Sequence, residues 1–116
     1  SDGTLDDTFF VGDGFNNMVY KIIAQPDGKI LVAGDFTSYN NVDNWRITRL
    51  NSNGVKDNSF NAGDGIDWDD YGTVYDMVLQ SDDKIILGGD FYNYNGYNSN
   101  YIVRINSNGS YVILLD

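Results

Sequence analysis

The sequence contains no cysteine and no histidine, and each absence removes a class of chemistry. Without cysteine, the chain can form no disulfide, no thiolate nucleophile and no cysteine-based metal site. Without histidine, no side chain has an unperturbed pKa near neutrality, and the commonest catalytic base is missing. Paired carboxylates can hydrolyse glycosides, but every Asp pair here sits in a turn pattern or in a short insertion. We therefore expect no enzymatic activity.

Positive charge is also scarce. The chain has 7 Lys and Arg against 17 Asp and Glu, which gives a formal net charge of −10 at pH 7. Nucleic acids and anionic membranes are bound by clusters of Lys and Arg, so we expect neither as a partner. No run of the sequence approaches the roughly 20 consecutive apolar residues of a transmembrane helix.

Aromatic residues and glycine are abundant, and there is a single proline: the chain has 9 Tyr, 6 Phe, 2 Trp and 13 Gly. Aromatic and β-branched residues favour strands, and Gly and Asn favour the tight turns between them. No segment has the apolar spacing of an amphipathic helix. We predict an all-β fold with almost no helix.

The chain repeats itself. Residues 17–54 and 72–109 align without a gap at an offset of 55, and 17 of the 38 paired positions are identical. The preceding loops align at an offset of 51, so that Phe9 corresponds to Phe60, and the difference locates a four-residue insertion within about 66–71. A fixed period of this size indicates a repeat architecture, in which each unit buries its apolar face against the next.

Each repeat has the composition of four short strands. For the first blade these are residues 18–25, 29–35 and 45–51 and a short outer segment at 55–60, and Asp27-Gly28 is a hairpin signal between the first two. Some runs are apolar at every position, which suits strands covered on both faces. Four short antiparallel strands make one blade of a β-propeller, so we predict two four-stranded antiparallel blades. The predicted inter-blade core consists of Val19, Ile22, Ile30, Val32 and Ile47, with Val74, Met77, Ile85, Leu87 and Ile102.

Four motifs point to a known family. They are Gly3, Leu5, Asp6 and Phe9; the run from Gln25 to Ile30; Gly-Asp-Phe at 34–36; and Arg-Leu-Asn-x-x-Gly at 49–54. With them the chain resembles the delta-60 repeat, a β-propeller repeat of bacterial surface and secreted proteins and of phage structural proteins. The resemblance implies one blade per repeat and no catalytic residues. It also implies an extracellular setting, in a phage virion or on a bacterial cell surface.

Two blades make only part of a ring, because propellers have roughly 4 to 8. Residues 1–116 are predicted to form one propeller segment, with repeat one at about 3–53, repeat two at about 54–108, and a tail at 109–116 that closes a blade or leads out of the ring. Several identical chains could complete the ring, with a six-bladed homotrimer favoured, or the blades could belong to a longer chain. Either way we expect a non-enzymatic structural or assembly module whose partner is itself or further blades.

The alternative function is glycan binding. The loops at one end of the blades, residues 10–17, 37–45, 61–72 and 92–100, are rich in aromatic residues, Asn and Asp. Sugars stack on aromatic rings and hydrogen-bond to fixed polar groups beside them. The candidate ligand-binding residues are Trp45, Trp68, Tyr39, Tyr71, Tyr94 and Tyr97. A plainer interpretation is that Tyr39 and Tyr94, which recur in both repeats, pack inside the blades.

The insertion in the second repeat is acidic. The candidate metal ligands, in the insertion and the loop just before it, are Asp64, Asp67, Asp69 and Asp70. Calcium takes about six to eight oxygen ligands, but this stretch lacks the ligand order and the distal Glu of an EF-hand. We expect a solvated acidic loop and no cofactor, with calcium as the alternative.

Overall fold

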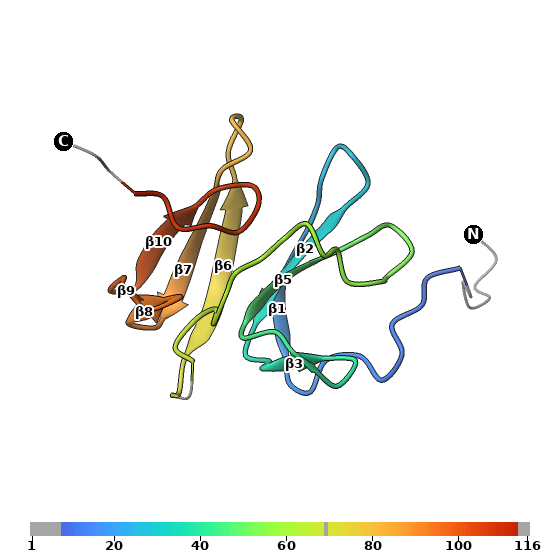
Figure 1. Ribbon diagram of the computed structural model, residues 1–116, viewed down its shortest axis with the longest axis horizontal. Coiled ribbons are helices and arrows are strands. Elements are labelled where there is room, and N and C mark those ends of the chain that lie inside the picture. The colour runs from blue at the N-terminus through green and yellow to red at the C-terminus, as the bar shows by residue number, and fades with distance from the viewer. Residues whose placement is uncertain (1–7, 69, 114–116) are drawn as a thin grey trace.

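The computed structural model describes residues 8–68 and 70–113, which form two three-stranded antiparallel sheets lying side by side (Figure 1). Blade 1 has the strand order β1-β2-β5, with β1 (Val19–Ala24), β2 (Ile30–Gly34) and β5 (Ile47–Leu50). Blade 2 has the order β10-β7-β6, with β6 (Thr73–Leu79), β7 (Ile85–Asp90) and β10 (Ile102–Ile105). The described residues contain no helix, and so none that could cross a lipid bilayer. The all-β prediction is confirmed.

The fourth strand of each blade is reduced to a single bridge. Lys56 pairs with Leu50 in blade 1, and Tyr111 pairs with Ile105 in blade 2. The ladder in blade 1 stops after Lys56 because the chain turns there, with the N–H of Phe60 donating to the carbonyl of Asp57. The predicted loops after β2 and β7 form two-stranded ribbons instead. These are β3 (Ser38–Tyr39) with β4 (Val42–Asp43), and β8 (Asn93–Tyr94) with β9 (Tyr97–Asn98).

A close backbone approach explains the repeated Gly-Asp-Phe motif. The register between the first two strands of blade 1 shifts between Val19 and Lys21, and blade 2 repeats the shift. A Cβ at Gly34 would lie 2.3 Å from the carbonyl oxygen of Met18, so only glycine fits at this bulge. The phenylalanine that ends the motif is fully buried in both blades. The motif therefore specifies how each blade begins its sheet.

Blade 2 packs its strand β6 against β1 and β2 of blade 1 (Figure 1). Met77 and Leu87 of blade 2, which are 1% and 0% exposed, lie in one apolar cluster with Leu31 and Ala33 of blade 1. Burial of such surface stabilises the pair by about 25 cal/mol per Å². Five of the predicted inter-blade residues belong to this cluster: Ile47, Val74, Met77, Ile85 and Leu87.

The other five predicted inter-blade residues lie elsewhere. Val19, Ile30 and Val32 are on the opposite face of blade 1, in a second cluster covered by the segment that precedes β1. Ile22 and Ile102 are 62% and 64% exposed. These five residues do not lie between the two blades of this chain, and their assignment to a contact with further blades stays a prediction. Within this chain, one face of each blade meets no other blade.

Candidate functional site

Tyr39 and Tyr94 are buried inside the blades, with exposed fractions of 3% and 0%. Their hydroxyls donate to the carbonyls of Gly54 and Gly109, in the turn that ends each repeat. Burial raises the pKa of both hydroxyls, so they remain neutral donors. Each ring ties a ribbon to an outer turn and offers no face on which a sugar could stack. The prediction of a ligand-binding role is wrong for these two residues.

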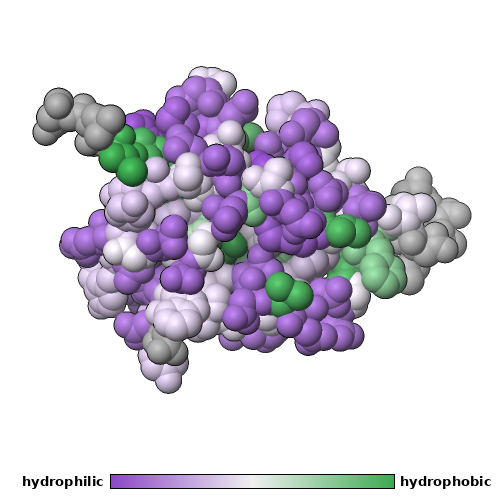
Figure 2. Space-filling view, viewed as in Figure 1, coloured by the Kyte–Doolittle hydropathy of each residue, from purple (hydrophilic) through white to green (hydrophobic). Residues whose placement is uncertain are grey.

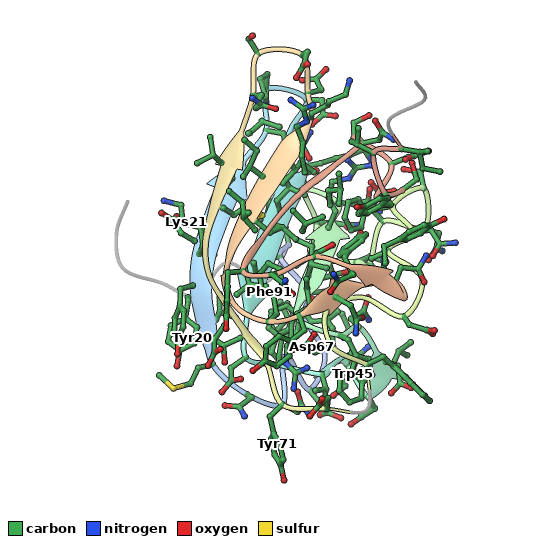
Figure 3. All side chains as sticks on the ribbon, turned by 90° about the vertical axis from the view of Figure 1, so that its left-hand side faces the viewer. Tyr20, Lys21, Trp45, Asp67, Tyr71 and Phe91 are labelled. Carbon is green, nitrogen blue, oxygen red and sulfur yellow. The ribbon has the colours of Figure 1, made fainter. Side chains whose placement is uncertain are left out.

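Trp45 and Tyr71 line a shallow open cavity of about 370 Å³, together with Thr37, Arg46 and Asp70. Figure 3 shows Trp45 and Tyr71 at the same end of the molecule, with Tyr71 projecting away from the body. Tyr71 is 93% exposed. The indole Nε1 of Trp45 is buried and has no hydrogen-bond partner among the described residues. The cavity thus combines aromatic surface with polar groups.

Trp68 and Tyr97 are exposed but do not line this cavity. Trp68 lies beside it, because its ring centre is 6.3 Å from that of Trp45. Tyr97 stacks on Tyr111 with ring centres 4.2 Å apart and planes 3° apart, so its own chain covers one of its faces. The structure therefore groups Trp45, Trp68 and Tyr71, and places Tyr97 in a different environment.

Where the structure describes them, the predicted acidic ligands do not gather into a metal-binding group. Within residues 8–68 and 70–113, no group of three or more acidic side chains could hold a metal ion. Asp64 and Asp70 are exposed, whereas Asp67 is 1% exposed. Asp69, the fourth predicted ligand, lies outside the described residues. The three described carboxylates are thus in different environments.

Asp67 has a structural role that its repeat counterpart explains. Its Oδ1 accepts hydrogen bonds from the backbone N–H groups of Tyr92 and Asn93, each at 2.9 Å. Asn16, the matching residue of the first repeat, accepts from the N–H groups of residues 37 and 38 in the same way. Asp67 therefore caps the start of a ribbon. Its second oxygen is buried without a partner among the described residues.

Arg46 holds the insertion against blade 1, a role that the sequence did not indicate. Its guanidinium donates to the carbonyl oxygens of Ile66, Asp67 and Asp70, at 3.0, 3.2 and 3.1 Å. Burial lowers the pKa of Arg46, and the carboxylates of Asp35, Asp67 and Asp70 oppose that shift. The backbone of Arg46 has a φ of 71°, which is uncommon for a bulky residue. The clamp links blade 1 to the segment that leads into blade 2.

Arg49 and Asp57 form a buried ion pair that the sequence likewise did not indicate. Nε of Arg49 lies 2.8 Å from Oδ2 of Asp57, and the two residues are 7% and 4% exposed. Burial favours a raised pKa for Asp57, but hydrogen bonds from Ser59, Arg49 and Lys29 outweigh it and hold that pKa well below its usual range. Arg49 also donates to the carbonyl of Ser107 at 2.6 Å, so the pair joins the two blades.

Two blade faces have no other blade packed against them among the described residues. We define the leading face as the side of blade 1 turned away from blade 2, with Ile22, Ile30 and Val32 on its strands. The trailing face is the side of blade 2 turned away from blade 1, with Val78, Ile86, Ile102 and Arg104 on its strands. Val78 and Ile102 are 53% and 64% exposed. Figure 2 shows apolar side chains gathered at both ends of the long axis, beside the two termini.

A protein-family model described as "Domain of unknown function (DUF5122) beta-propeller" matches residues 25–60 and 80–110. These two segments make up more than half of the chain and contain β2 to β5 and β7 to β10. No curated protein and no solved structure matches the chain. The predicted β-propeller repeat family is confirmed, and the narrower assignment to the delta-60 repeat stays a prediction.

Proposed function

Since the chain belongs to the DUF5122 beta-propeller family, whose function is unknown, we propose that it is a non-enzymatic structural module that contributes two blades to a propeller ring. The ring serves as a platform or connector, and its setting, a phage particle or a bacterial surface, is suggested by the sequence resemblance. The chemistry of such a module is burial of apolar surface between blades rather than conversion of a substrate.

One observation carries the proposal: residues at matching positions of the two repeats differ in burial according to whether a blade lies next to them. Met77 is 1% exposed between the blades, and its counterpart Ile22 is 62% exposed on the leading face. Ile47 is 1% exposed between the blades, and its counterpart Ile102 is 64% exposed on the trailing face. Exposed apolar faces of this kind mark interaction sites.

Three chains would supply six blades, within the range of roughly 4 to 8 that propellers use. Head-to-tail contacts between identical chains form a closed ring when their rotation closes. The test is the native mass of the purified chain by light scattering after size exclusion, with circular dichroism to verify the fold. We expect the mass of three chains. A folded monomer at all concentrations would contradict self-assembly and would favour further blades in a longer chain.

Glycan binding is the second candidate, and the cavity beside Trp45 is the observation that favours it. Its aromatic wall and its polar neighbours match what a sugar requires. Trp68 and Tyr71 are 53% and 93% exposed, so either can be replaced without disturbing a core.

A glycan array tests the second candidate. We expect Tyr71→Ala and Trp68→Ala to weaken binding at least tenfold while the native mass stays unchanged. Tyr75→Ala is the matched control, because Tyr75 is 56% exposed but lies on strand β6, outside the cavity. An array without binding by the wild-type chain, or equal binding by all variants, would exclude this site.

A further inference from the structure

The contact between the two blades of this chain provides a template for a contact between chains. Met77 and Leu87 of blade 2 pack in one cluster with Ala33 and Ile47 of blade 1. Phe60, which is 3% exposed, completes the cluster from the segment that leads into blade 2, and the guanidinium of Arg49 lies 5.1 Å from the centre of its ring. An aromatic wedge under an arginine therefore accompanies the packing of one blade on the next.

The leading face carries counterparts of the blade 2 residues in this contact. Ile22 and Val32 correspond to Met77 and Leu87 at the offset of 55, and Phe9 corresponds to Phe60 at the offset of 51. Phe9 is 40% exposed, in contrast to Phe60. Ile22 and Phe9 thus remain exposed on this side of the chain, whereas Val32 is already covered by the segment that precedes β1.

The trailing face carries counterparts of the blade 1 residues in this contact. Ile102 and Arg104 correspond to Ile47 and Arg49 at the offset of 55. Arg104 is exposed and forms no ion pair or hydrogen bond within the described residues, and the residue matching Asp57 is Val112. A cavity of about 360 Å³ opens between Ile102, Arg104 and Tyr111. The matching space in blade 1 is occupied by Phe60 and retains only about 130 Å³.

The charges on the inner strands also fit. Lys21 of β1 and Asp76 of β6 occupy matching repeat positions, and Nζ of Lys21 lies 3.5 Å from Oδ1 of Asp76 across the two blades. Figure 3 places Lys21 at the exposed edge formed by β1. When trailing and leading faces meet, Asp76 of one copy comes next to Lys21 of the following copy. Positive Lys21 and negative Asp76 then alternate from blade to blade around the whole ring, so that no two like charges are neighbours.

We infer that a second copy of this chain docks head to tail, its leading face on the trailing face of the first, with Phe9 entering the cavity under Arg104. This partner assignment rests on the proposed ring function and specifies the surfaces that close the ring. The contact is heterologous, so each chain uses one face for each of two neighbours.

Two variants, each blocked on one face, test the assignment. Ile22→Asp places a charge on the leading face, and Ile102→Asp places one on the trailing face. Both residues are more than half exposed in the single chain, so the fold tolerates the change, which circular dichroism verifies. Val42→Asp is the matched control, since Val42 is 63% exposed on the β3-β4 ribbon, away from the strands of both faces. Native masses are measured separately and for an equimolar mixture of the two blocked variants.

We expect the control to keep the wild-type mass, each blocked variant to be a monomer, and the mixture to give a dimer that grows no further. Phe9→Ala is expected to weaken assembly at least tenfold. A multimeric wild type with blocked variants of unchanged mass would overturn the assigned faces and leave the ring proposal standing. A mixture that returns to the full wild-type mass, or remains monomeric, would also overturn them. A monomeric wild type would overturn the ring proposal itself.

Discussion

Blade 1 and blade 2 are built to one plan but are open on opposite sides. Their strands pair in matching registers, including the shift near the start of β1 and of β6. Nevertheless, Ile47 is buried and Ile102 is exposed, whereas Met77 is buried and Ile22 is exposed. Matching residues thus differ because of their neighbours, and not because of their own strand. In a repeat protein, the exposed fraction of such a residue depends on whether another repeat packs next to its own.

The pair Arg46 and Tyr101 shows a second kind of difference. Both residues have a positive φ, 71° and 72°, so the backbone keeps its conformation although the side chain changes. Arg46 uses it to bind three carbonyls of the segment leading to blade 2. Tyr101 is 55% exposed, with its ring centre 6.0 Å from that of Tyr92. The contact within the chain therefore includes a clamp that a contact between chains would lack.

The largest effect is expected at the buried arginine. Arg49→Ala should lower the free energy of unfolding by about 3 kcal/mol, because it leaves the Asp57 carboxylate buried without its closest charged partner. At concentrations where the chain is a monomer, the matched substitution Arg104→Ala should change it by less than about 0.5 kcal/mol, since Arg104 is then exposed. Urea unfolding of both variants measures the difference. Equal losses of unfolding free energy in the two variants would contradict a stabilising ion pair that is present in blade 1 and absent from blade 2.

Met77 and Ile22 occupy matching positions in the two blades, but truncation should cost more stability at Met77 than at Ile22. Met77→Ala should cost about 2 to 4 kcal/mol, since it empties a position that is 1% exposed between the blades. Ile22→Ala should cost less than about 1 kcal/mol at concentrations where the chain is a monomer. Unfolding is followed by circular dichroism at low protein concentration. A large cost for Ile22→Ala in the monomer would mean that the leading face is covered within one chain.

Acid should weaken the fold through Asp57. The pKa of Asp57 is depressed in the folded state. Its contribution to the free energy of unfolding is therefore fully present above the unfolded pKa of about 4, and it is lost as the pH falls below that value. We expect the urea midpoint to fall from pH 5 to pH 3, and to fall less in Asp57→Asn. Asp82→Asn, in an exposed turn, is the control, and its urea midpoint should fall as much as that of the wild type. Identical pH profiles of the urea midpoint for wild type and Asp57→Asn would contradict the assignment of this acid sensitivity to Asp57.

The smallest expected effect lies in the hairpin turns. Blade 1 has Gly28 at a φ of 89°, whereas blade 2 has Asp83 at a φ of 68° in the matching position. Asp83→Gly should raise the free energy of unfolding by up to about 1 kcal/mol, because it relieves a left-handed conformation. Asp82→Gly should not, since the Asp82 carboxylate accepts a hydrogen bond from the N–H of Lys84. A higher melting temperature for the second variant than for the first would refute this explanation.

The repeat pattern predicted the blades because turn glycines, bulge glycines and apolar runs are local signals. It did not predict that Ile22 and Ile102 are exposed, since burial depends on how many blades stand in the array. The Arg46 clamp was missed because its acceptors are carbonyls 20 to 24 residues away, which no side-chain pattern reveals. The role of Tyr39 and Tyr94 had a visible signal: identical residues in both repeats serve the fold, while a residue unique to one repeat, such as Trp68, is a better candidate for function.

If another copy of the chain covers the trailing face, a cysteine introduced there is shielded from thiol reagents in the assembly. The rate of thiol labelling measures this shielding without background, because the chain has no cysteine of its own. Ile102→Cys reports on the trailing face, and Val42→Cys, at a position that is 63% exposed on the β3-β4 ribbon, is the control. The labelling rate of Ile102→Cys should fall at least tenfold as the protein concentration rises through the assembly range, while the control rate stays constant. Equal and constant rates at all concentrations would contradict the claim that another copy covers the trailing face.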